Sequence, residues 1–102
     1  MAGIRFEWDP AKAAINLQKH GVSFDMAIRA FGDPFALTDA DRIESGELRW
    51  QTLGLVEGHL LVLVAHTVRE EREEEQPVEV VRIISARRAD GKERRRYEEE
   101  QR

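Results

Sequence analysis

The hydrophobic pattern of this chain changes period once, near residue 35, and that change limits the folds open to it. Before this point, apolar residues recur at the three- and four-residue spacing of helices, and after it they alternate with polar residues as in strands. A chain of 102 residues has room for one domain with a single modest core. We therefore expect one α+β domain over residues 1–102, with helices first and a sheet after them.

The first predicted helix lies in "DPAKAAINLQKHG". Asp9 can cap its N-terminus, Pro10 suits its first turn, and Gly21 suits its end. Helical spacing then divides its side chains into two sets. Those expected to face the core are Ala14, Ile15 and Leu17, and those expected to face solvent or a partner are Lys12, Asn16 and Lys19.

The second predicted helix lies in "SFDMAIRAFGDP". Ser23 can cap its start, and Gly32 followed by Pro34 ends it. Its apolar residues recur at helical spacing and predict a buried stripe. The stripe consists of Phe24, Ala27, Ile28 and Phe31.

Strand patterns follow, with Glu57-Gly58 as a tight-turn signal between two of them. The acidic "REEREEEQP" is expected to form a charged loop or a ragged hairpin tip. A last helix should begin near Asp90, whose spacing to Glu93 is that of a capping box. The architecture expected is two N-terminal helices, an antiparallel-rich sheet of about four strands and a C-terminal helix. The expected strands are 35–39, 48–56, 59–68 and 78–87, with 6–9 as a further short one.

The composition excludes several kinds of chemistry. The sequence has no cysteine, which excludes disulfides, thiolate catalysis and cysteine-based zinc sites. Its histidines, His20, His59 and His66, are not at metal-ligand spacing, so we expect no metal and no cofactor. The N-terminus does not resemble a signal peptide, and the longest apolar run, 60–65, is too short to cross a membrane. A cytoplasmic protein is expected.

Positive and negative charges are segregated along the chain. The net charge is −4, which at first sight argues against a nucleic-acid ligand. The segment 69–76 carries five glutamates and two arginines, whereas 82–96 carries seven basic and two acidic residues, a sum of +5. A positive surface on an acidic protein is therefore possible.

Two interpretations of the basic segment are open. One is a solvated helix, because Arg94, Arg95 and Arg96 each precede a glutamate by four residues and can form ion pairs. The other is a phosphate-binding surface, which suits Arg87, because it ends a strand and has no helical partner of that kind. Strict alternation places Val81, Ile83, Ser85 and Arg87 on one face, and Val80, Arg82, Ile84 and Ala86 on the other.

Other candidate side chains also have two interpretations. The predicted central hairpin brings Arg49 to the same edge of the sheet as His66 and Arg69, although each arginine could equally be plain surface charge. His20 ends the first helix, where it either stabilises the helix C-terminus or transfers protons near neutral pH. Glu47 is either a carboxylate base or a solvated surface residue.

Motifs from both ends of the chain combine in a pattern that resembles the BrnT toxin family. The N-terminal motif is W-D-x-x-K…K-H-G, within "FEWDPAKAAINLQKHGVSF". The C-terminal motif is R-I-I-S-A-R-x-A…E-R-x-x-Y, within "RIISARRADGKERRRYE", and "RWQTLGLV" and "LVLVAHT" lie between the two. The resemblance spans nearly the whole chain.

The resemblance implies a fold and a function. BrnT proteins are similar to RelE-type toxins, which cleave RNA and block translation. A ribbon-helix-helix antitoxin, BrnA, neutralises the toxin and gives the complex its operator-DNA binding. This chain departs from such proteins at "REEREEEQPVE", where a short turn is usual. The acidic segment could repel RNA or contact a particular antitoxin.

Chemistry assigns roles to the matching positions. RNA cleavage without a metal needs a deprotonated 2′-hydroxyl, a protonated leaving oxygen, and cations around the charged phosphorane. Arginines supply that positive charge at any pH, as bidentate ligands of phosphate. Lys19 and Glu47 are alternatives to His20 for proton transfer. The expected site residues are His20, Arg49, Arg69 and Arg87 for catalysis, and Lys19, Arg88, His66 and Glu47 for RNA binding.

Two other functions remain open at this stage. One is a non-enzymatic module whose basic face docks an acidic protein. The other is a catalytically inactive toxin-like protein that serves as an antitoxin-binding or co-repressor subunit. A basic face alone does not separate these functions from a nuclease, because RNA and an acidic helix both prefer it.

Overall fold

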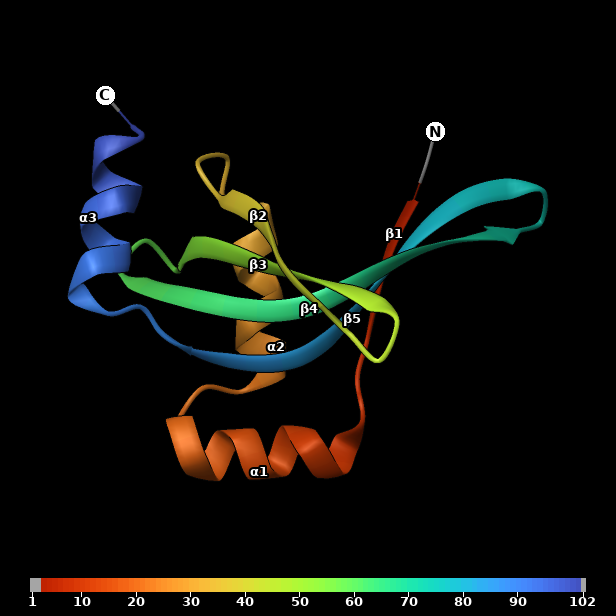
Figure 1. The fold of residues 1–102 in the computed structure, drawn as a ribbon, viewed down its shortest axis with the longest axis horizontal. Coiled ribbons are helices and arrows are strands. Elements are labelled where there is room, and N and C mark those ends of the chain that lie inside the picture. Colours follow the sequence, from red (N-terminus) through yellow and green to blue (C-terminus); the bar gives the residue numbers. More distant parts are fainter. Residues whose placement is uncertain (1–2, 102) are drawn as a thin grey trace.

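The computed structural model describes residues 3–101 and is organised around one strongly twisted sheet (Figure 1). Its elements are β1 (Gly3–Glu7), α1 (Pro10–His20), α2 (Phe24–Ala27), the 3-10 helix η1 (Ile28–Gly32), β2 (Leu37–Glu44), β3 (Glu47–Val56), β4 (Leu60–Glu73), β5 (Gln76–Arg88) and α3 (Gly91–Glu99). The five strands have the order β1-β5-β4-β3-β2.

The sheet is antiparallel except at one edge. Strands β2 to β5 pair antiparallel in sequence order, which confirms the expected antiparallel set. Strand β1 adds a fifth, because it pairs in parallel with the outer side of β5, from Gly3 opposite Val78 to Glu7 opposite Arg82. Beyond Arg82, no strand of residues 3–101 covers the outer side of β5.

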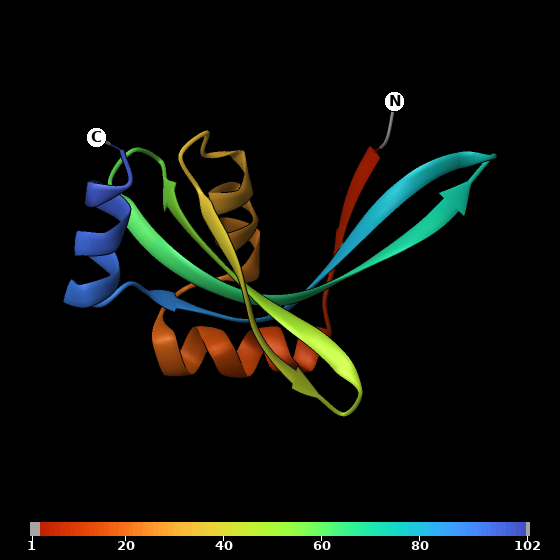
Figure 2. The same ribbon diagram turned by 45° about the horizontal axis from the view of Figure 1, so that its top comes forward.

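The helices surround the sheet in three places (Figure 2). Elements α2 and η1 pack against one face, which we call the α2 face, and bury the main core there. Helix α3 packs against the opposite face, the α3 face, where Tyr97 covers Leu53, Leu61 and Leu63. Helix α1 runs beside the uncovered part of β5.

Helix α1 has the predicted ends but not the predicted buried side. The Asp9 carboxylate accepts the Ala11 N–H at 2.9 Å, as a cap should. Ile15 and Leu17 are 63% and 49% exposed, whereas Asn16 is buried. The expectation was wrong because α1 meets a strand edge, which offers unpaired peptide groups, and not an apolar sheet face.

The Asn16 side chain satisfies those peptide groups. Its Nδ2 donates to the carbonyl oxygens of Ala86 at 2.9 Å and Val22 at 3.0 Å. Its Oδ1 accepts the Ala86 N–H at 3.1 Å. A buried peptide group without a partner costs about 1–3 kcal/mol, so one amide here offsets several such costs.

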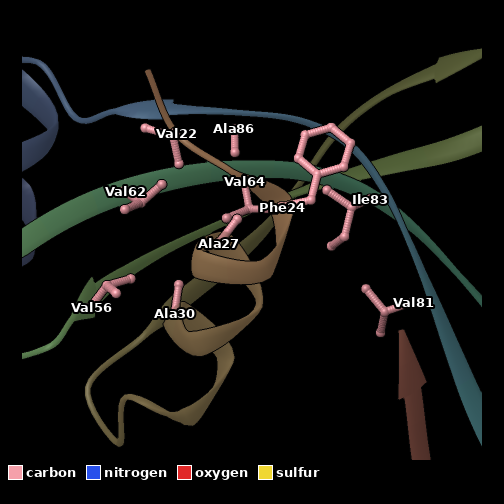
Figure 3. Packing of buried hydrophobic residues seen from close by; sticks show 10 residues of the cluster. All are labelled: Val22, Phe24, Ala27, Ala30, Val56, Val62, Val64, Val81, Ile83 and Ala86. Atoms are coloured by element: carbon pink, nitrogen blue, oxygen red, sulfur yellow. The ribbon is translucent and has the colours of Figure 1, made fainter. Parts of the chain in front are cut away.

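The main core lies between the α2 face and the helices, and its buried side chains converge in Figure 3. Phe24 and Ala27 are buried as predicted, and Ile28 and Phe31 pack against the same cluster. Gly54 of β3 lets η1 approach closely, because a Cβ at this position would lie 2.4 Å from the Ala30 carbonyl oxygen.

The acidic segment forms a regular hairpin arm that extends beyond the rest of the sheet (Figure 2). Strand β4 continues to Glu73, and β5 begins at Gln76. Glu74 and Glu75 make the turn with φ values of 50° and 66°. A two-residue turn with two positive φ values matches the twist of the flanking strands.

A β-bulge in β5 changes which side chains share a face. Ala65 of β4 lies opposite Ser85, and the next residue, His66, lies opposite Ile83, so Ile84 has no partner. Strict alternation was therefore wrong across this point. Val81 and Ile83 belong to the α2 face together with Ala86, whereas Ser85 and Arg87 belong to the α3 face with Val80 and Arg82.

The close approach at Gly54 yields a test of the fold. Gly54→Ala should lower the free energy of unfolding by about 1–3 kcal/mol, because the new methyl group must displace the η1 backbone. Gly32→Ala is the matched control, since nothing lies within 4 Å of a Cβ there. Urea unfolding measures both, and equal stability of the two variants would contradict the packing.

Candidate functional site

Five arginines from four strands lie on the α3 face, and we call this surface the arginine face. Strand pairing places Arg5, Arg69 and Arg82 there. Arg82 and Val80 are on the α3 face of β5, and Val80 lies between its partners Arg69 of β4 and Arg5 of β1. Trp50 lies opposite His66 and shares its α2 face. Its neighbour Arg49 therefore lies on the α3 face, because adjacent residues of a strand alternate between faces. The arginine face consists of Arg5, Arg49, Arg69, Arg82 and Arg87.

A ladder of ion pairs crosses this face near the hairpin arm. Glu7 of β1 accepts hydrogen bonds from Arg69 at 2.9 and 3.0 Å and from Arg82 at 3.0 Å. These bonds, the one from Arg69 first, lower the pKa of Glu7 from 4.5 to about 2. The ladder holds Glu7 as a carboxylate at any physiological pH.

The acidic arm supplies the other carboxylates of the ladder. Arg5 donates to Glu73 at 2.8 Å and to Glu71 at 3.0 Å. Glu71 also accepts the Arg69 Nε at 2.7 Å. Val80 lies between Arg5 and Arg69 and is fully buried, because the stems of long side chains cover apolar surface.

Arg87 lies at the other end of the face, beside α3. Its Nη1 and Nη2 donate to the two carboxylate oxygens of Glu93 at 2.8 and 2.9 Å. Arg87 has no partner at four-residue spacing, as expected, but the expectation that it is free of a carboxylate was wrong. Its partner, Glu93, is six residues away, across the strand-to-helix connection. Glu93 also accepts the Asp90 N–H in the predicted capping box, so one carboxylate orients both the helix and the guanidinium.

The arginines of α3 do not form the predicted local pairs. None of the three arginine–glutamate pairs at four-residue spacing occurs within residues 3–101. Arg96 instead bonds to Asp39 of β2. The basic segment is therefore not a helix of self-neutralising charges, and Arg94 and Arg95 are exposed.

His66 does not reach the arginine face. It lies on the α2 face, is 2% exposed, and places its Nε2 2.8 Å from the Thr52 hydroxyl oxygen. Its ring packs edge-on against Phe31, with ring centroids 4.9 Å apart. Burial lowers its pKa to about 4, so it is neutral at pH 7. An RNA contact by His66 does not fit this position.

The remaining expected residues lie in two other places. Lys19 and His20 line a groove between α1 and β5, outside the arginine face. Arg88 is exposed at the end of β5, opposite Val62 of the α2 face. Glu47 is exposed beside the β2–β3 turn, where the residue opposite it, Glu44, forms an ion pair with Arg49 at an N–O distance of 3.0 Å. The structure thus unites Arg49, Arg69 and Arg87 on one face and separates the other candidates from them.

Residues 3–101 contain neither a cluster of metal-ligating side chains nor a membrane-spanning helix. Among residues 3–101, no three His, Asp or Glu side chains are placed to hold a metal ion. No helix in that part of the chain is long and apolar enough to span a membrane.

Comparison with known proteins identifies the family. The family model for the ribonuclease toxin BrnT of type II toxin–antitoxin systems matches residues 8–93, most of the chain. The chain belongs to the BrnT family. Its fold is similar to the crystal structure of the Brucella abortus ribonuclease toxin BrnT, with a TM-score of 0.57 and 21% sequence identity, over 88% of this chain and 97% of that chain. No curated protein sequence matches.

Sequence reasoning missed three members of the site in this BrnT-family chain. Arg82 was assigned to the wrong face because the bulge at Ile84 has no sequence signal. Arg5 and Glu7 were missed because they join this face only when their strand, β1, pairs in parallel with β5. The Arg82 that bonds to Glu7 lies 75 residues later in the chain. A weak signal exists, since "IRFE" alternates apolar and charged residues ahead of α1.

The buried imidazole makes stability depend on pH. The folded pKa of His66, about 4, lies below its ordinary value of 6.5, so stability falls as pH decreases from 6.5 toward 4. Urea unfolding should show a loss of about 2 kcal/mol between pH 7 and pH 5. Glu7, whose pKa is about 2, remains ionised in this range, and hydrogen bonds from Arg69 and Arg5 also lower the pKa of Glu71. His66→Gln should remove most of this loss, and an unchanged slope in that variant would contradict the assignment.

Proposed function

We propose that this chain is an active endoribonuclease and that its RNA substrate lies across the arginine face. The observation that carries the proposal is the gathering of five arginines from four strands on one sheet face of a protein with a net charge of −4. Membership of a family of ribonuclease toxins supports the same reaction. Guanidinium groups bind phosphate through two parallel hydrogen bonds, as they now bind carboxylates.

The reaction we propose needs no metal ion. The RNA 2′-oxygen loses its proton and attacks the adjacent phosphorus, the bond to the 5′-oxygen breaks, and that oxygen gains a proton. The products are a 2′,3′-cyclic phosphate and a 5′-hydroxyl. Arg87 would stabilise the additional negative charge on the phosphorane, where one such contact contributes about 10²–10³ in rate. Arg69, six residues along β4 from the residue opposite Arg87, would bind a neighbouring phosphate of the same RNA.

Proton transfer is assigned to His20. His66 is buried and His59 lies at the β3–β4 turn, so His20 is the remaining histidine at a groove. Glu7 is a poor base, because its arginine partners lower its pKa to about 2. RNA that crosses the β5 edge could meet both Arg87 and the His20 imidazole.

The antitoxin is proposed to be a ribbon-helix-helix protein of the BrnA type, through which the complex binds operator DNA. Support comes from the family, whose members belong to type II toxin–antitoxin systems. We place the toxin in the cytoplasm, where its RNA substrate and the operator are found.

A catalytically inactive antitoxin-binding or co-repressor subunit is the second candidate. It is favoured by the pairing of every arginine of the arginine face with a carboxylate in the free chain. The two functions differ in one measurable property, the cleavage of RNA by the isolated chain in the presence of EDTA.

A matched pair of variants tests the nuclease. Arg87→Ala should reduce cleavage of RNA in EDTA by about 10²–10³, because it removes a charge-stabilising contact. Glu93→Gln breaks the same ion pair but leaves the cation, so it should retain most of the cleavage. Growth inhibition in a bacterial host should follow the same order.

Comparing Arg87→Ala with Glu93→Gln separates a role of Arg87 in cleavage from a role in stability. Both variants lose the Arg87–Glu93 pair, so thermal unfolding followed by circular dichroism should show similar, modest losses of stability. Both should also still bind the antitoxin. If both variants lose cleavage equally, Arg87 acts only by anchoring α3. If the wild-type chain does not cleave RNA, the co-repressor function replaces the nuclease.

The acidic arm should weaken RNA binding through specific carboxylates. Glu71→Gln with Glu73→Gln frees Arg5 and Arg69, so RNA affinity at low salt should rise. Glu74→Gln with Glu75→Gln changes the net charge equally at the turn and should have a smaller effect. Fluorescence anisotropy with labelled RNA measures both. Equal affinities for the two double variants would mean that the ladder does not compete with RNA.

A further inference from the structure

The groove between α1 and β5 differs from the arginine face because, among residues 3–101, its lysines have no ion-pair partners and no acidic residue lines it. Its volume is about 200 Å³, and one wall is α1 while the other is the bulged part of β5. The residues that line it are Lys12, Ile15, Asn16, Lys19, His20, Ile84 and Ser85. It exists because α1 is held beside the strand edge by the bonds between Asn16 and Ala86.

The cations of this groove are free of acidic partners. Neither Lys12 nor Lys19 forms an ion pair with a carboxylate of residues 3–101. The arginines of the arginine face are all paired, by contrast. An anion that enters the groove therefore displaces only water, whereas one that binds at Arg69 must displace Glu7 and Glu71.

The residues that line the groove favour a negatively charged ligand. The chain contains 20 acidic residues, yet none of them lines this groove. Two ammonium groups, an imidazole and the Ser85 hydroxyl line the groove, and each can donate a hydrogen bond to an anion. Such a set of donors suits the oxygen atoms of a phosphate group.

Ser85 connects the groove to the arginine face. It lies on the α3 face, as Arg82 and Arg87 do, and it also lines the groove. No strand of residues 3–101 covers β5 at this point, so a ligand on the arginine face can continue over the strand edge toward α1. This continuity favours an extended polyanion over a separate small ligand.

We propose that the α1–β5 groove binds a backbone phosphate of the RNA that crosses the arginine face, through Lys12 and Lys19. The proposal rests on the proposed nuclease function, and it adds a site next to the cleaved bond. In this arrangement the unpaired lysines attract the RNA first, and the paired arginines then exchange their carboxylates for phosphates.

The salt dependence of RNA binding tests the groove. The probe is a 2′-O-methyl RNA oligonucleotide, which cannot be cleaved because its 2′-oxygen is blocked. Lys12→Gln with Lys19→Gln should lower the slope of log K against log salt by about 0.7, the value for the loss of one single-strand phosphate contact. Arg29→Gln with Lys92→Gln removes the same charge from exposed sites elsewhere and should leave the slope unchanged. Thermal unfolding confirms that both double variants are folded.

The possible outcomes show whether the groove proposal or the nuclease proposal fails. If the wild type cleaves RNA but the lysine variant keeps the wild-type slope, the groove proposal fails and the nuclease stands. If the wild type neither binds nor cleaves RNA, both fail. If the lysine variant loses antitoxin binding and keeps its RNA slope, the groove docks an acidic protein, which overturns the proposal. Binding of inorganic phosphate by the wild type, with no change of RNA slope in the variant, overturns it as well.

Discussion

The β-bulge at Ile84 is the constraint on which the site depends. Arg82 and Arg87 are five positions apart, so an unbroken strand would direct them to opposite faces. The unpaired residue shifts the alternation by one, and both guanidinium groups then lie on the α3 face. The same shift keeps Ile83 and Ala86 in the core on the other side. One local irregularity therefore serves packing and charge placement at once, as bulges near functional sites often do.

In the free chain, carboxylates neutralise the arginines of the arginine face. Isolated arginines at close quarters repel each other, and carboxylates from β1, the hairpin arm and α3 remove this repulsion. The pairs are partly exposed, so each contributes little to stability and can exchange with another anion. A protein with a net charge of −4 can in this way hold together the cluster of arginines that we propose to bind phosphate.

Local signals made the elements of the fold predictable, and long-range pairing made the site harder to predict. The caps at Asp9 and Asp90 act within one helical turn, and sequence spacing is sufficient to find them. The bulge, the parallel pairing of β1 and the burial of His66 depend on neighbours far along the chain. Asn16 is the sharpest case, because a polar residue on a short helix normally predicts solvent exposure.

The role of Asn16 at the strand edge has a consequence for assembly. An open strand edge can extend by adding a strand from another chain, which is a common mode of peptide recognition and of aggregation. The Asn16 amide engages both the N–H and the C=O of Ala86, so it completes this edge as a neighbouring strand would. A second chain therefore cannot continue the sheet at this point of β5, and strand addition is left to the outer edges of β1 and β2.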